Sequence, residues 1–552
     1  MGRRRRARPV LGGAALGLAA ALGLAGARPP PAGKAGEPRE ERGVRGPPLL
    51  GVNVHFAVGK EGEVAQLSRG FSAVRNDFRW TAVEAEGNGT YDFTMYEAQH
   101  AELAAHGLTA LFILDYSNGA VPGCGPKHTG VRTEPCRKAF AAWAVASMSH
   151  FKDRVPRPIF ELWNEPNGFW DPFTNYTEYA ELAREVFEQR AAVPGLEEGS
   201  TLIGPGVASF HTDDTWWWLE QCAKRGGLDG FDWVSVHPYR SDAPETVLGD
   251  YERLRGLAGS RPLASSEWGY STCDAFAEVP RPDCAPGTGH SEDTEAKYLA
   301  RMFLVNSLAG LPVSIFYDWQ DDCIDPADRE CRHGVVENHY FNKTVPHKPK
   351  PAYVAAETVQ RSVGGRALVG PLEAGGGGGV FALEWEGGVL SAWNWVGSNR
   401  TDGSCAMDLR DTARCGSGLG RAECEAVGCC FAEHVPNKDI GEWCHLPPLN
   451  YTVSAEVATG AVGQCWTRVG LDGAESAEIE CADERGNLRL ALDDAPVFLV
   501  PSSHFFQVKM HALISVYLCH PARFLLLPRH PAPVAPSRAP HRLDAIQQLW
   551  FL

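Results

Sequence analysis

Short apolar runs alternate with longer segments of helical periodicity between residues 49 and 362, and this alternation leaves few possible folds. The runs have the length and composition of buried strands, and each is followed by a helical segment. Eight such units follow one another along the chain. Strands that alternate with helices form parallel sheets, and eight units in roughly 200–400 residues are the repeat of a (β/α)8 barrel. The sequence therefore predicts an α/β fold with a (β/α)8 TIM barrel over residues 49–362.

A doubly wound open sheet is the alternative α/β fold for such a pattern. That fold binds its ligand at a glycine-rich turn after the first strand. No such turn follows the first apolar run of this chain. In addition, polar residues stand at the ends of many different runs, as they do around the mouth of a barrel. The closed barrel is therefore the better prediction.

The first 48 residues have the features of a targeting segment and a linker. Residues 1–27 contain a basic start, an apolar run from Val10 to Leu24 and small residues at a cleavage position after Ala27, which together predict a secretory signal peptide. An uncleaved signal anchor is the alternative, because the apolar run approaches the length of a spanning helix. Residues 28–48 are rich in Pro, Gly, Arg and Glu, and we interpret them as a linker.

The region after the barrel changes to short β-like runs separated by glycines. These runs predict a C-terminal β-sandwich over residues 366–402 and 448–502. A cysteine-dense segment, residues 403–447, interrupts the sandwich. We assign no fold to the tail, residues 503–552.

The chain has 16 cysteines, and their spacing predicts disulfides in an oxidising compartment. Four close pairs are expected to be bridged: Cys124/Cys136, Cys273/Cys284, Cys323/Cys331 and Cys465/Cys481. Zinc is the alternative for the dense segment, although the Cys-x2-Cys spacing of zinc knuckles is absent there. Five glycosylation sequons agree with a secreted glycoprotein, at Asn88, Asn175, Asn342, Asn399 and Asn450. The formal charge of −16 makes nucleic acid an unsuitable partner, and we expect no obligate membrane partner.

Two carboxylates stand where predicted strands end. Glu165 follows the fourth strand, which we expect to stop near this residue because Pro166 cannot donate to a sheet ladder. Glu267 follows the seventh strand. The ends of these two strands face each other across a barrel mouth, where active sites lie. A facing pair of carboxyl groups performs retaining glycoside hydrolysis, in which one protonates the leaving oxygen and the other attacks the anomeric carbon.

Five short motifs in this region, taken in order, resemble those of retaining glycoside hydrolases of clan A, nearest to families 5 and 39. The motifs are Asn164-Glu165-Pro166, His237-Pro238-Tyr239-Arg240, Glu267-Trp268-Gly269-Tyr270, Tyr317-Asp318-Trp319 and Lys348-Pro349-Lys350-Pro351-Ala352-Tyr353. The resemblance covers about residues 49–362. It departs from some relatives at Leu114-Asp115-Tyr116, where they have a histidine. The substrate preference of those relatives therefore cannot be assigned to this chain.

The resemblance implies roles for the two carboxylates and their neighbours. Glu165 would be the acid/base and Glu267 the nucleophile, and Asn164 would hydrogen-bond the sugar 2-hydroxyl. Tyr239 would hold the nucleophile, and Arg75 on the second strand would keep it ionised. A cation near Glu267 agrees with that role, because it lowers the pKa of a carboxyl group.

Three further residues are expected to bind substrate. The resemblance implies that His237 contacts the substrate or the acid/base and that Trp319 forms the floor of the −1 sugar site. Trp170 follows the acid/base on its loop and is a candidate for an aromatic subsite. Two of the candidate residues also have a purely structural alternative. Arg75 could form an ion pair with Asp77, and Trp319 could pack in the barrel core.

The cysteine-dense segment resembles a P-type trefoil domain, because Cys429-Cys430 are adjacent and the segment closes in Trp443-Cys444. The resemblance implies the disulfides Cys405–Cys430, Cys415–Cys429 and Cys424–Cys444. A trefoil would bind a glycan or mucin-like ligand, or act as a rigid spacer.

The sequence thus predicts a secreted retaining glycosidase that acts on a poly- or oligosaccharide and uses no cofactor and no metal, and the resemblance favours β-linked bonds. A catalytically inactive barrel that binds carbohydrate is the alternative from another functional class. A metal-dependent hydrolase is a second alternative, but the sequence contains no His-x-x-x-His or similar ligand set.

Overall fold

A computed structural model describes residues 46–502 except 128, 171–174, 275–283, 285–288, 338–345, 376–378, 396–413, 417–429, 433–442 and 446–452. The predicted signal peptide (1–27), most of the linker (28–48) and the tail (503–552) lie outside the described residues. No helix in the described part of the chain is both long enough and apolar enough to cross a membrane.

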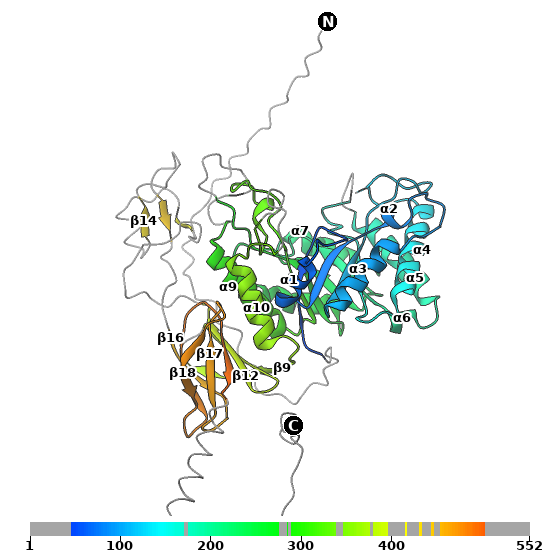
Figure 1. Ribbon diagram of the computed structural model, residues 1–552. Coiled ribbons are helices and arrows are strands. Elements are labelled where there is room, and N and C mark those ends of the chain that lie inside the picture. Colours follow the sequence, from blue (N-terminus) through cyan, green and yellow to red (C-terminus); the bar gives the residue numbers. More distant parts are fainter. Residues whose placement is uncertain are drawn as a thin grey trace, which may run out of the picture. The chain divides into compact units, whose positions relative to one another are not determined.

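Eight parallel strands close into a barrel in chain order, which confirms the predicted fold of the first part (Figure 1). β1 pairs with both β2 and β8, and this second pairing closes the sheet. The strands are β1 (Leu49–Asn53), β2 (Ala73–Arg79), β3 (Thr109–Asp115), β4 (Ile159–Leu162), β5 (Thr201–Val207), β6 (Trp233–Val236), β7 (Leu263–Trp268) and β8 (Val313–Phe316).

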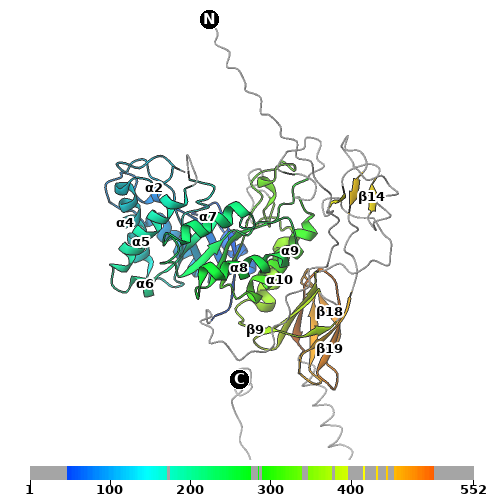
Figure 2. The same cartoon turned by 180° about the vertical axis from the view of Figure 1, so that it is seen from behind.

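Helices alternate with the strands and lie around the barrel, as the two views show (Figures 1 and 2). The α-helices are α1 (Glu63–Gly70), α2 (Trp80–Val83), α3 (Thr94–Ala105), α4 (Glu134–Phe151), α5 (Tyr176–Ala191), α6 (Leu196–Gly199), α7 (Asp213–Ala223), α8 (Leu248–Ala258), α9 (Glu292–Leu308) and α10 (Pro351–Val363). Short 3-10 helices are η1 (Pro244–Val247) and η2 (Glu330–Arg332). Side-chain caps fix several helix starts; for example, Asn175 accepts from the backbone of Thr177 at the start of α5.

The barrel interior changes from apolar to charged along its strands. A small cluster that includes Ala73, Ile159 and Ile315 fills the barrel. Successive side chains of a strand alternate between the interior and the helices, so the residues two positions further along β2 and β4 also point inward. These residues are Arg75 and Glu161, and both are buried. The charged layer therefore lies directly above the apolar layer, toward the carboxyl ends of the strands.

The fourth strand ends earlier than the sequence indicates. β4 stops at Leu162, three residues before the expected end near Glu165. Trp163 and Glu165 have left-handed backbone angles, with φ values of 67° and 48°, which extended strands do not allow. The Glu165 amide donates to the Gly206 carbonyl of β5 at 3.1 Å. A tight turn, and not the strand itself, presents the Glu165 side chain.

The C-terminal region forms antiparallel sheets from both predicted stretches. A six-stranded sheet has the order β18-β17-β20-β12-β11-β9, and a three-stranded sheet has the order β10-β16-β19. Their strands are β9 (Leu368–Pro371), β10 (Ala374–Gly375), β11 (Val380–Trp385), β12 (Val389–Asn394), β16 (Val453–Ala458), β17 (Cys465–Val469), β18 (Glu475–Cys481), β19 (Asn487–Leu492) and β20 (Val497–Pro501). One buried apolar cluster draws residues from both sheets, including Leu390 and Leu490. A two-layer sandwich remains the prediction for this region.

The four close cysteine pairs are disulfide-bonded as predicted: Cys124–Cys136, Cys273–Cys284, Cys323–Cys331 and Cys465–Cys481. The predicted trefoil contributes three short strands, β13 (Arg414–Gly416), β14 (Cys430–Ala432) and β15 (Trp443–His445), in the order β13-β15-β14. Its cysteine side chains (Cys405, Cys415, Cys424, Cys429, Cys430 and Cys444) lie outside the described residues, and their pairing stays a prediction.

Candidate active site

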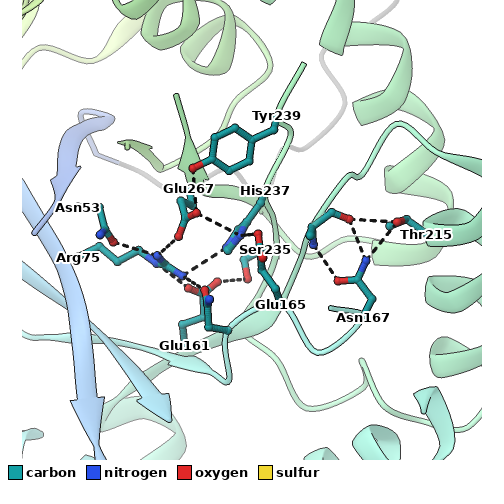
Figure 3. Close-up of polar contacts among 12 residues, drawn as sticks. Asn53, Arg75, Glu161, Glu165, Asn167, Thr215, Ser235, His237, Tyr239 and Glu267 are labelled. Atoms are coloured by element: carbon teal, nitrogen blue, oxygen red, sulfur yellow. Dashed lines mark hydrogen bonds and ion pairs between the residues drawn. The ribbon is translucent and has the colours of Figure 1, made fainter. Parts of the chain in front are cut away.

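Arg75 stands at the centre of a polar cluster in the barrel mouth (Figure 3). Its Nε donates to Glu161 Oε2 at 2.9 Å, and its Nη1 donates to Asn53 Oδ1 at 3.0 Å. Nη1 also donates to Glu267 Oε2, and Nη2 donates to Asn164 Oδ1 at 2.8 Å. The planar guanidinium thus joins four side chains from the carboxyl ends of β1, β4 and β7 in one fixed arrangement. The predicted alternative, an ion pair with Asp77, is not formed, because Asp77 pairs with Arg79.

Glu161 anchors the underside of this cluster and was not among the predicted site residues. Its Oε1 accepts a hydrogen bond from the Ser235 hydroxyl at 2.6 Å, and its Oε2 faces Arg75. Gly206 leaves space here, because a Cβ at that position would lie 2.8 Å from Glu161 Oε1. The Glu161 side chain is fully buried, and a buried carboxylate is stable only with such partners. Glu161 therefore positions the guanidinium that contacts Glu267.

His237 on the loop after β6 contacts the first predicted catalytic residue. Its Nδ1 lies 2.8 Å from Glu165 Oε1, and its Nε2 lies 3.3 Å from Arg75 Nη2. Burial lowers the pKa of His237, but the charge of Glu267 and the hydrogen bond to Glu165 outweigh it and raise the pKa above its ordinary value. The surroundings of His237 therefore favour its positively charged form beside Glu165.

Glu267 is surrounded by donors and positive charge. Tyr239 donates its hydroxyl hydrogen to Glu267 Oε1 at 2.9 Å, and Arg75 donates to Oε2. Burial raises the pKa of Glu267, but the charges of His237 and Arg75, together with these hydrogen bonds, outweigh burial and lower it. Glu267 is consequently held as a carboxylate in a dry environment.

Asn164 and Asn167 fix the turn that carries Glu165. Asn164 accepts from Arg75, and its Nδ2 donates to the Tyr116 hydroxyl at 3.2 Å. Asn167 exchanges two hydrogen bonds of 2.9 Å with the backbone of Ala208, and its Nδ2 donates to Thr215 at 3.2 Å (Figure 3). These contacts tie the turn to β5 and α7 and hold Glu165 in place.

The two carboxyl groups approach each other closely but lie in different surroundings. Oxygens of Glu165 and Glu267 lie, with a nitrogen of His237, within 4.8 Å of one another. Glu267 contacts Arg75, whereas Glu165 contacts His237. The same three side chains have the spacing of metal ligands, and the Arg75 guanidinium adds a positive charge beside them through its contact with Glu267 Oε2. The two carboxyl groups therefore have different partners, as two groups with different roles in one reaction require.

Both predicted tryptophans are almost fully buried. Trp319 is 1% exposed, donates its indole hydrogen to Glu63 Oε1 at 3.0 Å and packs against His347 and Tyr353. Trp170 is also 1% exposed, and its indole nitrogen donates to Glu178 Oε2 at 2.8 Å. A ring stacked on sugar needs an accessible face. The geometry therefore does not favour the predicted stacking roles, and both residues pack within the walls of the barrel.

Tyr317 lies in the barrel mouth near Tyr239. It follows β8 directly, is half-buried, and its ring centroid lies 6.4 Å from that of Tyr239. Phe316, one position earlier, packs with the outer core, so the alternation of β8 turns Tyr317 inward. Inward-facing side chains recur at every second residue of a strand, so the residue two positions after Ile159 is Glu161 and the residue two positions after Trp233 is Ser235. This alternation is the sequence signal that could have identified both residues.

A scan of protein-family models and a search of curated proteins find no match for this chain. Solved structures do resemble it. A family 39 glycoside hydrolase from the gut symbiont Bacteroides cellulosilyticus WH2 has a TM-score of 0.53 at 20% identity and covers 83% of this chain and 81% of its own. A glucosidase from Croceicoccus marinus has a TM-score of 0.49 at 12% identity and covers 83% of this chain and 96% of its own.

A xylanase 10B from Thermotoga petrophila RKU-1 resembles the chain more distantly, with a TM-score of 0.41 at 15% identity over 57% of this chain and 94% of its own. At 20% identity the likeness to the family 39 structure shows the fold alone. The chain shares a closed parallel barrel with that structure, and its chemistry has to be argued from its own site.

Proposed function

We propose that this protein is a retaining glycoside hydrolase that cleaves O-glycosidic bonds of a poly- or oligosaccharide, with a preference for β-linkages. The observation that carries the proposal is the pair Glu165 and Glu267, whose oxygens lie within 4.8 Å of each other in contrasting surroundings. Retaining enzymes hold their two carboxyl groups about 5–5.5 Å apart, whereas inverting enzymes need roughly 6.5–9.5 Å to admit a water between them. The short separation supports the retaining mechanism.

The first chemical step forms a glycosyl ester. Glu165 donates its proton to the oxygen of the leaving group while the Glu267 carboxylate attacks the anomeric carbon, and the bond between that carbon and the leaving oxygen breaks. Tyr239 and Arg75 hold the attacking carboxylate in place. In the second step Glu165 takes a proton from water, the water oxygen attacks the anomeric carbon, and Glu267 leaves as a carboxylate.

The neighbouring residues have supporting roles in this proposal. Asn164 presents an amide beside Glu165 for the sugar 2-hydroxyl, and its other contacts, to Arg75 and Tyr116, fix its orientation. His237 contacts Glu165 and holds its carboxyl group in orientation for both steps. Tyr317 forms the floor under the sugar in place of Trp319.

Aryl glycosides test the proposal directly. We expect the wild-type protein to release the aryl group from at least one β-glycoside in a panel of common sugars, and Glu267→Gln to lose at least a thousandfold in kcat. Proton NMR of the first product should show the anomeric configuration of the substrate. Equal turnover by Glu267→Gln, or an inverted first product, would refute the mechanism. Glycan binding without turnover would indicate an inactive, carbohydrate-binding barrel.

Secretion is a second part of the proposal. Four disulfides in the described residues support an oxidising compartment, since such bonds do not persist in the cytosol. Expression of the full chain in a eukaryotic secretory host, followed by N-terminal sequencing of the medium fraction, tests it. A mature N-terminus at Arg28 would confirm cleavage after Ala27, whereas retention in the membrane fraction would indicate the signal anchor.

A further inference from the structure

The seventh strand of the barrel contains a β-bulge just before its carboxyl end. Ser265 of β7 pairs with Ser314 of β8, but the next paired residues are Trp268 and Phe316. Three steps along β7 therefore match two steps along β8. An extra residue of this kind changes which way the following side chains point, and bulges are common beside active sites for that reason.

The bulge turns Glu267 into the barrel mouth. Ala264 belongs to the apolar cluster that fills the barrel, so Ser265 points outward, toward the helices. Regular alternation from Ser265 would also point Glu267 outward. With the extra residue, Trp268 packs in the outer core instead, and Glu267 faces inward, where it meets Arg75. The direction of the proposed nucleophile thus depends on this irregularity of β7.

Arg240, in the loop after β6, packs against the outer side of the bulge. Its guanidinium lies over the Trp268 ring, with Cζ 5.6 Å from the ring centroid. The Trp268 side chain is fully buried, and a cation at this distance is attracted by the face of an indole. A guanidinium can also stack there as a flat plate, which an ammonium group cannot do. Arg240 therefore contacts the residue that directly follows the nucleophile.

Three hydrogen bonds fix the Arg240 side chain in this position. Nε donates to the Pro238 carbonyl at 3.1 Å, Nη1 donates to Thr246 Oγ1 at 3.2 Å, and Nη2 donates to Asp250 Oδ2 at 3.0 Å. The Arg240 side chain is only 7% exposed, so dissolved salt screens its ion pair with Asp250 little. The guanidinium is consequently held by the loop itself and by the helix that follows it.

These contacts tie the loop after β6 to β7 beside Glu267. Pro238 directly precedes Tyr239, whose hydroxyl donates to Glu267 Oε1 at 2.9 Å. The guanidinium that holds the Pro238 carbonyl also packs on Trp268. Arg240 therefore has one contact on each of the two segments whose spacing sets the hydrogen bond between Tyr239 and Glu267.

We propose that Arg240 is a positioning residue that clamps the loop after β6 onto the bulge of β7, and so holds the Glu267 carboxylate toward the anomeric carbon and against the Tyr239 hydroxyl. The inference rests on the proposed glycosidase function and adds to it a residue that acts through Glu267 and not on the substrate. Loss of the clamp lowers the rate of attack much more than it lowers substrate affinity.

Arg240→Met tests the clamp, because it keeps an apolar stem and removes the planar cation. We expect kcat on an accepted aryl glycoside to fall at least about tenfold, since a misplacement of about 1 Å can cost roughly a hundredfold, and KM to change far less. The acidic limb of the kcat/KM profile should move to higher pH, because a looser Tyr239 hydrogen bond lowers the pKa of Glu267 less. Arg240→Lys, which keeps the charge but not the plane, should have an intermediate effect.

A dinitrophenyl glycoside separates an effect on the nucleophile from an effect on the acid/base. Its leaving group needs no proton, so the first step depends on attack by Glu267 alone. Arg240→Met should slow this substrate by about the same factor as an alkyl glycoside, and should equally slow inactivation by a fluorinated analogue that accumulates as the glycosyl ester. A loss confined to alkyl glycosides would mean that Arg240 acts through Glu165, and would overturn the clamp.

Arg253→Met is the matched control variant. Arg253 on α8 also lies over a tryptophan, with Cζ 4.1 Å from the Trp216 ring centroid, and its Nη2 lies 3.4 Å from Glu220 Oε1. Both partners belong to α7, so this stack joins two outer helices and not the loop beside the nucleophile. The control should keep the wild-type kcat and the wild-type pH profile. Circular dichroism and thermal unfolding show whether each variant is folded.

A purely structural role of Arg240 predicts a different result. Folded Arg240→Met and Arg240→Lys proteins with a lower melting temperature, but with the wild-type kcat and acidic limb, would overturn the inference and leave the glycosidase function standing. If Arg240→Met does not fold, Asp250→Asn gives the same test with a smaller expected loss, because it weakens one anchor and leaves the stack on Trp268. A wild-type protein that cleaves no glycoside refutes the proposed function, and the inference with it.

Discussion

Arg75 and Glu161 form a buried ion pair of 2.9 Å between the second and fourth strands of the barrel, directly beneath the two carboxyl groups of the candidate active site. The guanidinium has a second ionic partner, Glu267, and both contacts use the same rigid plane. A change at Glu161 should therefore affect the nucleophile without touching the substrate. This relationship makes Glu161 a positioning residue.

Glu161→Gln tests this positioning role. The amide keeps the shape of the side chain but leaves a buried guanidinium with one carboxylate partner, which we expect to lower the free energy of unfolding by roughly 3 kcal/mol. We also expect kcat to fall, with an altered pH profile, because Arg75 shifts relative to Glu267. Denaturant unfolding and pH-dependent kinetics measure both effects. Glu97→Gln, in a surface pair with His150 and Arg154, should change stability by less than about 1 kcal/mol.

Tyr239→Phe should move the acidic limb of the kcat/KM profile to higher pH. The nucleophile must be ionised, and the Tyr239 hydrogen bond is one of the interactions that lower the pKa of Glu267. Without it the pKa rises, and activity is lost at a higher pH as the medium is acidified. One hydrogen bond corresponds to a shift of up to about one pH unit. An unchanged acidic limb would show that Tyr239 does not influence Glu267.

Substrates with different leaving groups distinguish Glu165 from Glu267. In Glu165→Ala, a dinitrophenyl glycoside should retain far more activity than an alkyl glycoside, because a good leaving group needs no proton. Azide should accelerate this variant and give a glycosyl azide of retained configuration. Glu267→Ala should lose activity on both substrates. The reverse pattern would show that Glu267 is the acid/base and Glu165 the nucleophile.

Substitutions of Tyr317 and Trp319 should change different measured quantities, the kinetic parameters in one case and the melting temperature in the other. Tyr317→Ala removes the half-buried ring beside Tyr239, and we expect both a higher KM and a lower kcat. Trp319→Phe loses the hydrogen bond to Glu63 in a packed wall, and we expect mainly a lower melting temperature. A purely kinetic effect of Trp319→Phe would restore its predicted role as the sugar floor.

Activity should not depend on a divalent cation. Glu165, His237 and Glu267 have ligand spacing, but a metal beside Glu267 would be repelled by Arg75 and by a protonated His237. Dialysis against EDTA, followed by assay with and without added zinc, calcium or magnesium, checks this expectation. A loss of activity that one of these metals restores would favour the metal-dependent hydrolase.

Local sequence patterns were sufficient for the barrel and for the principal residues of its mouth. The alternation of apolar runs and helical segments specified eight units, and the closed sheet contains all of them in chain order. Glu165 and Glu267 could be found because each stands at the end of a predicted strand, where a barrel collects its side chains, whereas Arg75, His237 and Tyr239 were implied by the family resemblance. The four close disulfides followed from cysteine spacing alone.

The points that the sequence could not decide concern which side chain is buried and which is open. Trp319 and Trp170 were chosen for their chemistry, and in the structure both are buried and donate hydrogen bonds to Glu63 and Glu178. Glu161 looked like part of an apolar strand, because its partners Arg75 and Ser235 are 86 and 74 residues away.

The sequence by itself determined the secondary-structure repeat, the strand ends and the kinds of side chain placed there, since these depend on local periodicity and turn chemistry. Only the tertiary structure decided that one guanidinium holds both Glu161 and Glu267, that His237 contacts Glu165, and that a bulge in β7 turns Glu267 into the mouth. The physical reason is that burial, charge pairing and strand register arise where distant segments meet, and no local pattern encodes those distances.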